Sequence, residues 1–211
     1  MTDAATRRWT VVLPVKHAAR AKSRLGSVPA AGPALARAIA LDTIDAVASC
    51  GAVDRVVVVT DDAELEASVP SGVLVVTDRA GAGPNAAIVE AMSKLDESSP
   101  RAALLADLPA LRPADLESAL AAASRVQRGV VPDAEGTGST LVTASSGMTW
   151  ASAFGPASFE KHLALGCTQL DVLPDSSLRR DVDTPAHLDT ATALGLGPRT
   201  AAALRLAVHG S

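Results

Sequence analysis

The stretch from Ala102 to Leu111 constrains the fold of this chain most, because it joins a buried strand to a turn through a single acid. The residues from Ala102 to Ala106 form a short apolar run, and such runs are typical of strands covered on both faces of a sheet. Asp107 ends the run, and Pro109 lacks the N–H group that a continuing strand would need. The pattern predicts a strand that ends at an acid and a turn.

A helix is predicted directly after this turn. Pro113 and Asp115 are residues that favour a first helical turn, and the apolar residues after them recur at helical spacing. These apolar residues are Leu116, Ala119, Leu120 and Ala123. In open α/β sheets ligands bind beyond the carboxyl ends of the strands, so Asp107 is expected to face a ligand. Aspartate also stabilises turns without any ligand, and this stretch alone does not separate the two interpretations.

Length and composition indicate one globular domain. The chain has 211 residues, of which 48% are apolar, and no segment reads as a linker, so we expect a single domain over residues 1–211. No apolar run approaches the roughly 18 residues of a membrane span, and the first residues lack a signal-peptide pattern. Cys50 and Cys167 have no metal-type spacing. These features predict a cytoplasmic protein without a membrane partner.

The charge pattern excludes a general nucleic-acid binder but favours a small anion. The net charge is −4, and two Phe, two Trp and no Tyr offer few platforms on which bases could stack. No acid occurs between Asp3 and Asp42, whereas seven basic residues do: Arg7, Arg8, Lys16, Arg20, Lys22, Arg24 and Arg37. A positive field of this kind suits a triphosphate, although a solvated basic loop would look the same.

Strand and helix patterns alternate along most of the chain. Strands are predicted at 9–15, 55–60, 73–76, 129–132, 140–144 and 170–173, and helices at 35–48, 63–68, after Asn85 as an N-cap, at 158–165, after Thr184 and at 200–208. The alternation predicts an α/β fold with a mostly parallel sheet and helices on both faces. The basic loop that follows Val15 matches neither the phosphate-binding P-loop nor the dinucleotide fingerprint.

Two acids are candidate metal ligands. Asp107 ends a buried strand, and Asp183 stands at a helix start about 75 residues later. Two acids brought together by the fold would form the hard oxygen site that Mg²⁺ prefers. Asp181 is a competing ligand, and an acid before a helix is also favourable without a metal.

Two later segments could bind an anion. Gly136-Thr137-Gly138-Ser139 offers backbone N–H groups and hydroxyls, although an ordinary turn before a strand has the same composition. Ser158 is predicted to cap a helix whose start could bind phosphate, and His162 lies one turn later. A buried, hydrogen-bonded histidine is the alternative for His162. No Ser/His/Asp or Cys/His spacing indicates a nucleophile, which suits a reaction in which an already anionic phosphate attacks.

Taken together, these stretches resemble the 2-phospho-L-lactate guanylyltransferase family of coenzyme F-420 biosynthesis, and most of all its actinobacterial branch, which uses phosphoenolpyruvate. The matching pieces cover most of the chain in family order: Pro14-Val15-Lys16, Ala21-Lys22-Ser23-Arg24-Leu25, Asn85-Ala86-Ala87-Ile88, Asp107-Leu108-Pro109-Ala110-Leu111, Gly136 to Ser139, Phe154 to Phe159 with His162, and Asp181-Val182-Asp183-Thr184-Pro185. Two positions depart from the family pattern: Ser139 replaces a usual threonine, and Ala106 replaces a frequent glycine.

The resemblance implies a nucleotidyltransferase fold like that of nucleotide-diphospho-sugar enzymes, with Mg²⁺ held by Asp107 and Asp183. It places the phosphorylated acid near Ser139, Gly155 and Ser158. It assigns the nucleotide phosphates to Lys16, Lys22 and Arg24, with Lys22 also catalytic, and the nucleoside end to Asn85. GTP and a phosphorylated acid are the implied partners, with handover of an unstable product to the next enzyme of the pathway.

The resulting hypothesis is transfer of GMP from GTP to phosphoenolpyruvate or 2-phospho-L-lactate, with release of pyrophosphate. Two alternatives stay open at this point: a related transferase that acts on a sugar phosphate or molybdopterin, and a non-catalytic nucleotide-binding module.

Overall fold

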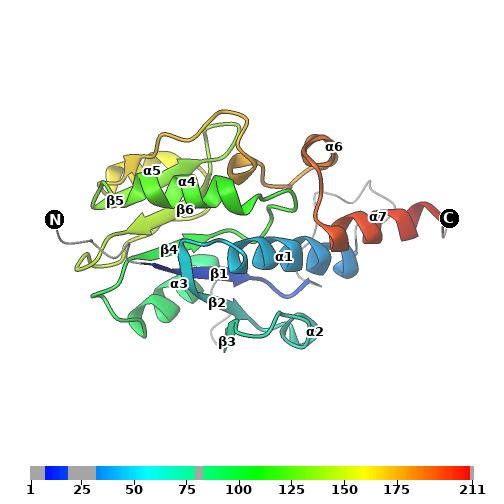
Figure 1. Cartoon of the computed structure of the whole chain (residues 1–211), viewed down its shortest axis with the longest axis horizontal. Helices are drawn as coiled ribbons and strands as arrows, with labels where there is room; N and C mark the ends of the chain where they lie inside the picture. Colours follow the sequence, from blue (N-terminus) through cyan, green and yellow to red (C-terminus); the bar gives the residue numbers. More distant parts are fainter. Residues whose placement is uncertain (1–7, 19–31, 79–82, 210–211) are drawn as a thin grey trace.

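A sheet of seven strands, in the order β3-β2-β1-β4-β6-β5-β7, forms the centre of the computed structural model (Figure 1). The structure describes residues 8–18, 32–78 and 83–209. The strands are Trp9–Val15 (β1), Val53–Thr60 (β2), Leu74–Thr77 (β3), Arg101–Leu104 (β4), Arg128–Pro132 (β5), Ser139–Ala144 (β6) and Thr168–Gln169 (β7). Six of the predicted strands correspond to observed ones, since the run that starts at Ala102 is β4.

The sheet is mostly parallel, as the alternation of elements predicts. β3, β2, β1 and β4 are parallel neighbours, whereas β6 is antiparallel to β4 and to β5. The register pairs Leu104 with Leu141, so Ser139 at the start of β6 lies beside the turn that follows β4. The antiparallel strand therefore begins where the parallel strands end, and it brings Ser139 to the same edge of the sheet as Asp107.

Helices cover both faces of the sheet. They are Pro33–Ala48 (α1), Ala63–Glu66 (α2), Pro84–Ser93 (α3), Pro113–Ala123 (α4), Ser158–Ala164 (α5), Pro185–Leu194 (α6) and Pro198–His209 (α7), with a 3₁₀ turn at Ser177–Arg179 (η2). Side chains alternate along each strand, so Val11 and Leu13 pack with α1 and α4, and Val12 packs with α3 on the opposite face. The predicted apolar residues of α4 are all buried.

The two C-terminal helices pack against α1 rather than against the sheet. Leu35 and Ile39 of α1 contact Leu188 of α6 and Leu204 of α7 in a separate apolar cluster. The Asp42 carboxylate accepts hydrogen bonds from the first N–H groups of α7, at Arg199 and Thr200. In Figure 1 α7 lies beside α1 and projects past the end of the sheet.

The last part of the sheet departs from the sequence prediction. We expected a strand at 170–173, but the edge strand β7 covers only Thr168 and Gln169. Leu170 still donates its N–H to the carbonyl of Val130, after which the chain leaves the sheet. No helix within the described ranges is long and apolar enough to cross a membrane.

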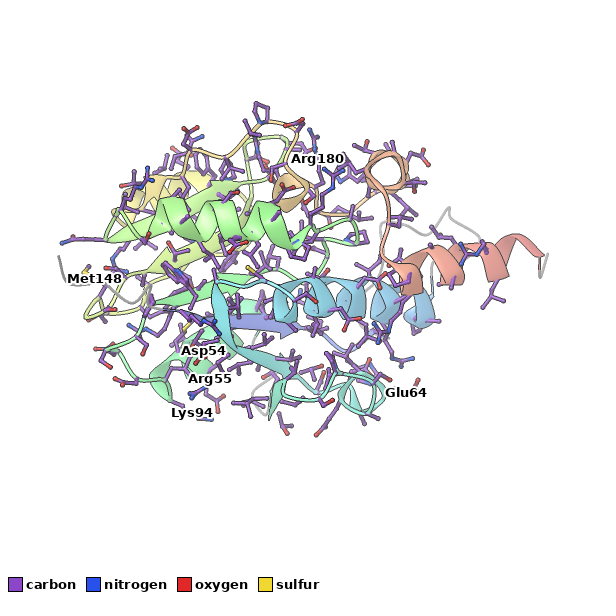
Figure 2. The ribbon with its side chains drawn as sticks, in the orientation of Figure 1. Asp54, Arg55, Glu64, Lys94, Met148 and Arg180 are labelled. Atoms are coloured by element: carbon purple, nitrogen blue, oxygen red, sulfur yellow. The ribbon has the colours of Figure 1, made fainter. Side chains whose placement is uncertain are left out.

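The two ends of β2 lie on opposite sides of the molecule and differ in their surroundings. Figure 2 shows Asp54 and Arg55 at the start of the strand, where both side chains are exposed. Glu64, in α2 beyond the other end of β2, lies on the opposite side of the view. The strand therefore leads from an exposed start to the edge where β1 and β4 also end.

Candidate active site

A cavity of about 840 Å³ opens at the carboxyl ends of β1 and β4. Six of the predicted site residues line it: Lys16, Asp107, Ser139, Gly155, Ser158 and Asp183. Lys22 and Arg24 lie outside the described residues. Asn85 is not part of the lining, although its neighbour Pro84 is. The fold thus brings together residues from five separate segments of the chain.

Two polar anchors position Asp107 in the turn after β4. The Thr43 hydroxyl on α1 accepts from the N–H of Leu108 at 3.1 Å, and its hydrogen is shared between the carbonyls of Ile39 and Ala106, at 2.9 and 3.3 Å. The Asp107 carbonyl accepts from the N–H of Val182 at 2.9 Å. This backbone contact places Asp181 and Asp183 next to Asp107 across a sequence separation of about 75 residues.

Asp107 and Asp181 are half-buried in the cavity, Asp183 is exposed, and the three charges repel one another. Burial, followed by the charges of Asp181 and Asp183, raises the pKa of Asp107 to about 7. Burial, together with the charges of Asp133 and Asp183, raises the pKa of Asp181 to about 6. One carboxylate oxygen of each, Oδ1, is buried and has no hydrogen-bond partner among the described residues. Buried acceptors without partners are costly, so this site favours a cation.

The acidic group extends beyond the pair that the sequence predicts. One ligand atom each from Asp133, Glu135 and Asp181 lie within 4.8 Å of one another. Asp181 is therefore shared between this group and Asp107. Carboxylate oxygens of this number and closeness fit a divalent cation. From the sequence, Asp181 is only an alternative to Asp183 as a metal ligand, because spacing alone does not show that both acids line the cavity.

The basic side of the cavity is formed by Lys16, which directly follows β1. Its side chain is exposed, and its charge favours the ionised form of Asp107. Arg37, also in the acid-free stretch of the sequence, is engaged elsewhere, because its Nε is 3.0 Å from Asp62 and its Nη1 is 2.6 Å from Glu64. Among the described basic residues of that stretch, Lys16 is thus the one that lines the cavity.

The segment from Asp133 to Ser139 is a tight turn rather than a loop with free N–H groups. The Asp133 carboxylate accepts from the N–H groups of Thr137 and Gly138, and its carbonyl accepts from Gly136. A Cβ at Gly138 would lie 2.3 Å from the Asp133 carboxylate, so glycine is required there. The backbone binding of an anion that we considered is therefore wrong for these three groups, and the turn instead delivers the Ser139 hydroxyl.

The segment from Ala153 to Ser158 forms the opposite wall of the cavity. Asn85 was predicted to cap α3 and to contact the nucleoside, but the helix is capped at Gly83. The Asn85 amide donates to the carbonyl of Phe154 at 2.6 Å and accepts from its N–H at 2.8 Å. Gly155 and Ala157 have positive φ of 129° and 53°. Asn85 thus holds an unusual backbone segment against the cavity.

α5 follows this segment and carries two buried polar residues. Its N-cap is Ala157, so the prediction that Ser158 is the N-cap is wrong, and Ser158 is the first helical residue. His162 is fully buried and lies 3.0 Å from Ser139 Oγ through its Nδ1. The alternative that treated it as a hydrogen-bonded buried histidine is confirmed.

Solved structures share this fold at low sequence identity. A protein from Desulfovibrio desulfuricans, described as a nucleotide-diphospho-sugar transferase, has a TM-score of 0.64 and 17% identity over 94% of this chain and 97% of its own. A 4-diphosphocytidyl-2C-methyl-D-erythritol synthase from Anaerococcus prevotii has a TM-score of 0.60 and 9% identity over 89% and 96% of the two chains. The predicted nucleotidyltransferase fold is confirmed.

Closer relatives share the sequence over nearly its full length. A phosphoenolpyruvate guanylyltransferase from Streptomyces coelicolor is 48% identical over 96% of this chain and 99% of its own. One from Thermomonospora curvata is also 48% identical, over 92% and 87% of the two chains. Residues 22–164 match the family of MobA-like NTP transferase domains. The chain therefore belongs to the MobA-like NTP transferase family, in a group with the actinobacterial phosphoenolpyruvate guanylyltransferases.

Proposed function

We propose that this protein transfers GMP from GTP to phosphoenolpyruvate and releases pyrophosphate. One observation carries the proposal: a single cavity is lined by Ser139 and Ser158 and by Asp107 and Asp181, whose Oδ1 atoms have no hydrogen-bond partner among the described residues. The acids suit a metal–triphosphate, and the hydroxyls suit an anionic acceptor. Relatives at 44–48% identity are phosphoenolpyruvate guanylyltransferases by name, and they suggest the identity of the nucleotide and of the acid.

The acceptor acid is proposed to lie between β6 and α5. Ser139 and Ser158 are both buried, at 3% and 2% exposure, and both line the cavity. Their hydroxyls can donate to carboxylate or phosphate oxygens, and the open backbone at Gly155 allows a ligand to approach closely. The acceptor phosphate would then face the acids at Asp107, where the α-phosphate of GTP is expected.

The reaction needs positioning more than acid–base chemistry. An oxygen of the acceptor phosphate forms a bond to the α-phosphorus of GTP, and the bond from that phosphorus to the bridging oxygen of pyrophosphate breaks. Because the attacking oxygen is already anionic at pH 7, no side chain has to remove a proton. In this proposal Lys16, which lines the cavity, holds the negative phosphates together, and the cavity walls keep the two substrates in line.

We propose that Asp107, Asp181 and Asp183 hold Mg²⁺ in the working enzyme. The partnerless oxygens and raised pKa values of Asp107 and Asp181 fit such a cation, since a bound positive charge favours the ionised carboxylates. When bound, Mg²⁺ would supply charge neutralisation to the phosphates. Asp183 donates its backbone N–H to His187, so the start of α6 fixes the segment that carries these acids.

The experiment that tests the proposal is a pyrophosphate-release assay with GTP and Mg²⁺. Phosphoenolpyruvate and 2-phospho-L-lactate are supplied in separate reactions, and the mass of each nucleotide product is measured. We expect a GMP adduct of phosphoenolpyruvate. If only 2-phospho-L-lactate gives an adduct, that acid is the acceptor instead of phosphoenolpyruvate. The two acids are the natural pair to compare, because both place a carboxylate beside a phosphate ester.

Two other outcomes would reject the proposal. An adduct formed only with a sugar phosphate or molybdopterin would identify a different transferase of the same fold. Tight GTP binding without pyrophosphate release for any acceptor would indicate a binding module. A role of Lys22 and Arg24 at the nucleotide phosphates, the handover of product to a further enzyme and a cytoplasmic location stay predictions from the sequence.

A further inference from the structure

His162 is a buried polar residue next to the cavity to which the proposed reaction assigns no role. It lies on α5, is 0% exposed and contacts the ring of Phe154 edge to face at 5.0 Å. It does not line the cavity but lies behind Ser139, which does. Its two ring nitrogens make contacts with two different walls of the site.

These contacts determine which ring nitrogen carries the hydrogen. The backbone N–H of Ala153 donates to Nε2 at 2.9 Å, and a backbone N–H can only donate. Nε2 must therefore be unprotonated. Burial lowers the pKa of His162 to about 4 and outweighs a contact with the Ser158 backbone that raises it, so the ring is neutral at pH 7. Its one N–H is thus on Nδ1, which lies 3.0 Å from the Ser139 hydroxyl oxygen.

This tautomer fixes the direction of the Ser139 hydroxyl. Nδ1 donates to Ser139 Oγ, so it cannot also accept the Ser139 hydrogen. No other described residue accepts that hydrogen from Ser139. The side chain is buried at 3% exposure but lines the cavity, so the space open to the hydrogen is the cavity itself.

We propose that His162 is a positioning residue, which donates from Nδ1 to Ser139 Oγ and thereby directs the Ser139 O–H toward a carboxylate or phosphate oxygen of the acceptor acid. This inference rests on the proposed function, because it takes the acid to lie at Ser139. Through Nε2 the same ring holds Ala153, at the start of the opposite wall. His162 thus sets the hydroxyl and spaces the two walls between which the acid would lie.

Two substitutions separate the two contacts of the ring. In His162→Asn the short amide places an N–H donor near the position of Nδ1, but nothing reaches Ala153. In His162→Gln the longer amide reaches Ala153, but its chain is a methylene where Nδ1 branches off, so no donor faces Ser139. If His162 orients the Ser139 hydroxyl, the Gln variant should bind the acid more weakly than the Asn variant. A role limited to holding Ala153 predicts the reverse order.

The measured quantities are KM for phosphoenolpyruvate, KM for GTP, kcat and direct binding of phosphoenolpyruvate by calorimetry with Mg²⁺. We expect His162→Gln to raise the acid KM about 10-fold and Ser139→Ala about 10- to 100-fold, since a hydrogen bond to an anion is lost or misdirected. His162→Asn should stay within about 3-fold, and the GTP KM should be unchanged throughout. In a Ser139→Ala background, His162→Gln should add no further loss.

A readout without substrate keeps this inference separable from the proposed function. The ring ¹⁵N chemical shifts of His162 in the wild-type protein should show a neutral ring with hydrogen on Nδ1 at pH 7. A hydrogen on Nε2, or equal losses in the Asn and Gln variants, would overturn the inference. If the wild-type protein binds phosphoenolpyruvate but forms no GMP adduct, the proposed function fails, and the binding series still decides the role of His162.

Discussion

Asp62 follows β2 and is buried, Asp107 follows β4 and is half-buried, and the surroundings of the two acids are opposite. Asp62 caps α2 by accepting from Glu64 and Leu65, accepts from the N–H of Ala18, and pairs with Arg37. Burial alone would raise its pKa, but these hydrogen bonds and the arginine outweigh burial and lower it. Among the described residues Asp107 Oδ1 has no hydrogen-bond partner, and burial with the charges of Asp181 and Asp183 raises the pKa of Asp107 to about 7. An acid whose oxygens are hydrogen-bonded and ion-paired stabilises the fold, whereas an acid with an unpartnered buried oxygen is a candidate ligand-binding group.

The substitution Asp107→Asn should have the largest effect on activity. The amide keeps the shape of the side chain but removes the charge that would hold a metal, so we expect kcat/KM to fall about 10³-fold or more. The unfolding midpoint in EDTA should not fall, because a repulsive buried charge disappears. Pyrophosphate release and thermal unfolding measure the two effects. Wild-type activity in this variant would remove Asp107 from the mechanism.

The substitution Asp62→Ala should reverse this pattern. It leaves the N–H groups of α2 and the Nε–H of Arg37 without their acceptor, and we expect a loss of about 2 to 3 kcal/mol in the free energy of unfolding. Activity per folded molecule should stay within a few-fold of wild type. Urea unfolding measures the change, with the exposed Asp54 of Figure 2 as the matched control for Asp→Ala. Equal losses at both positions would contradict a specific role of the Asp62 contacts.

The two acids should also contribute to the pH dependence of stability with opposite signs. The folded-state pKa of Asp107 is raised from 3.8 to about 7, so the folded protein binds more protons and the metal-free protein loses stability as pH rises through this range. The lowered pKa of Asp62 gives stability that is present above its ordinary value and is lost as pH falls.

Comparison of wild type with Asp107→Asn isolates the first contribution. In EDTA, the free energy of unfolding of the wild type relative to the variant should fall between pH 5 and pH 8, on the order of 2 kcal/mol. Added Mg²⁺ should stabilise the wild type more at pH 8 than at pH 5, because protons compete for the same oxygens. If the difference in free energy of unfolding between wild type and variant does not change with pH in EDTA, another group already neutralises the Asp107 charge in the metal-free protein.

The smallest expected effect concerns Asn85, another satisfied polar residue. Its amide nitrogen and its amide oxygen both bond the backbone of Phe154, so we expect Asn85→Ala to act on the wall near Gly155 rather than on the nucleotide. The KM for the acid should rise about 5-fold while the KM for GTP stays constant, since two neutral hydrogen bonds are lost. A change limited to the GTP KM would restore the sequence prediction of a nucleoside contact.

Local periodicity made much of the fold predictable from the sequence. The buried face of α4 and the strand β1 follow from side-chain spacing, which depends only on neighbouring residues. The N-cap at Thr184 with Pro185 after it was likewise predicted, because capping chemistry is local. The edge strand β7 was misplaced because its two residues are set by pairing with β5, which no local pattern encodes.

The candidate site was predictable in part for the same reason. The cavity contains Asp107, Ser139 and Asp183, which the motif order had indicated. Asn85 was misassigned because an amide near a helix start fits an N-cap and also a contact with Phe154, 69 residues away. A signal for this was the Gly83-Pro84 pair, since glycine is accepted as an N-cap and proline at the first helical position.

The backbone contact between Asp107 and Val182 also has a consequence for how the protein is made. The strands β1 to β4 are complete in the nascent chain long before residue 182 is added, about 75 residues after Asp107. At a synthesis rate of roughly 5–20 residues per second, this interval lasts on the order of 4 to 15 s. Until the segment of Asp181 and Asp183 is made, two of the three acids of the proposed metal site are missing. A chain still on the ribosome therefore carries only part of the proposed metal site.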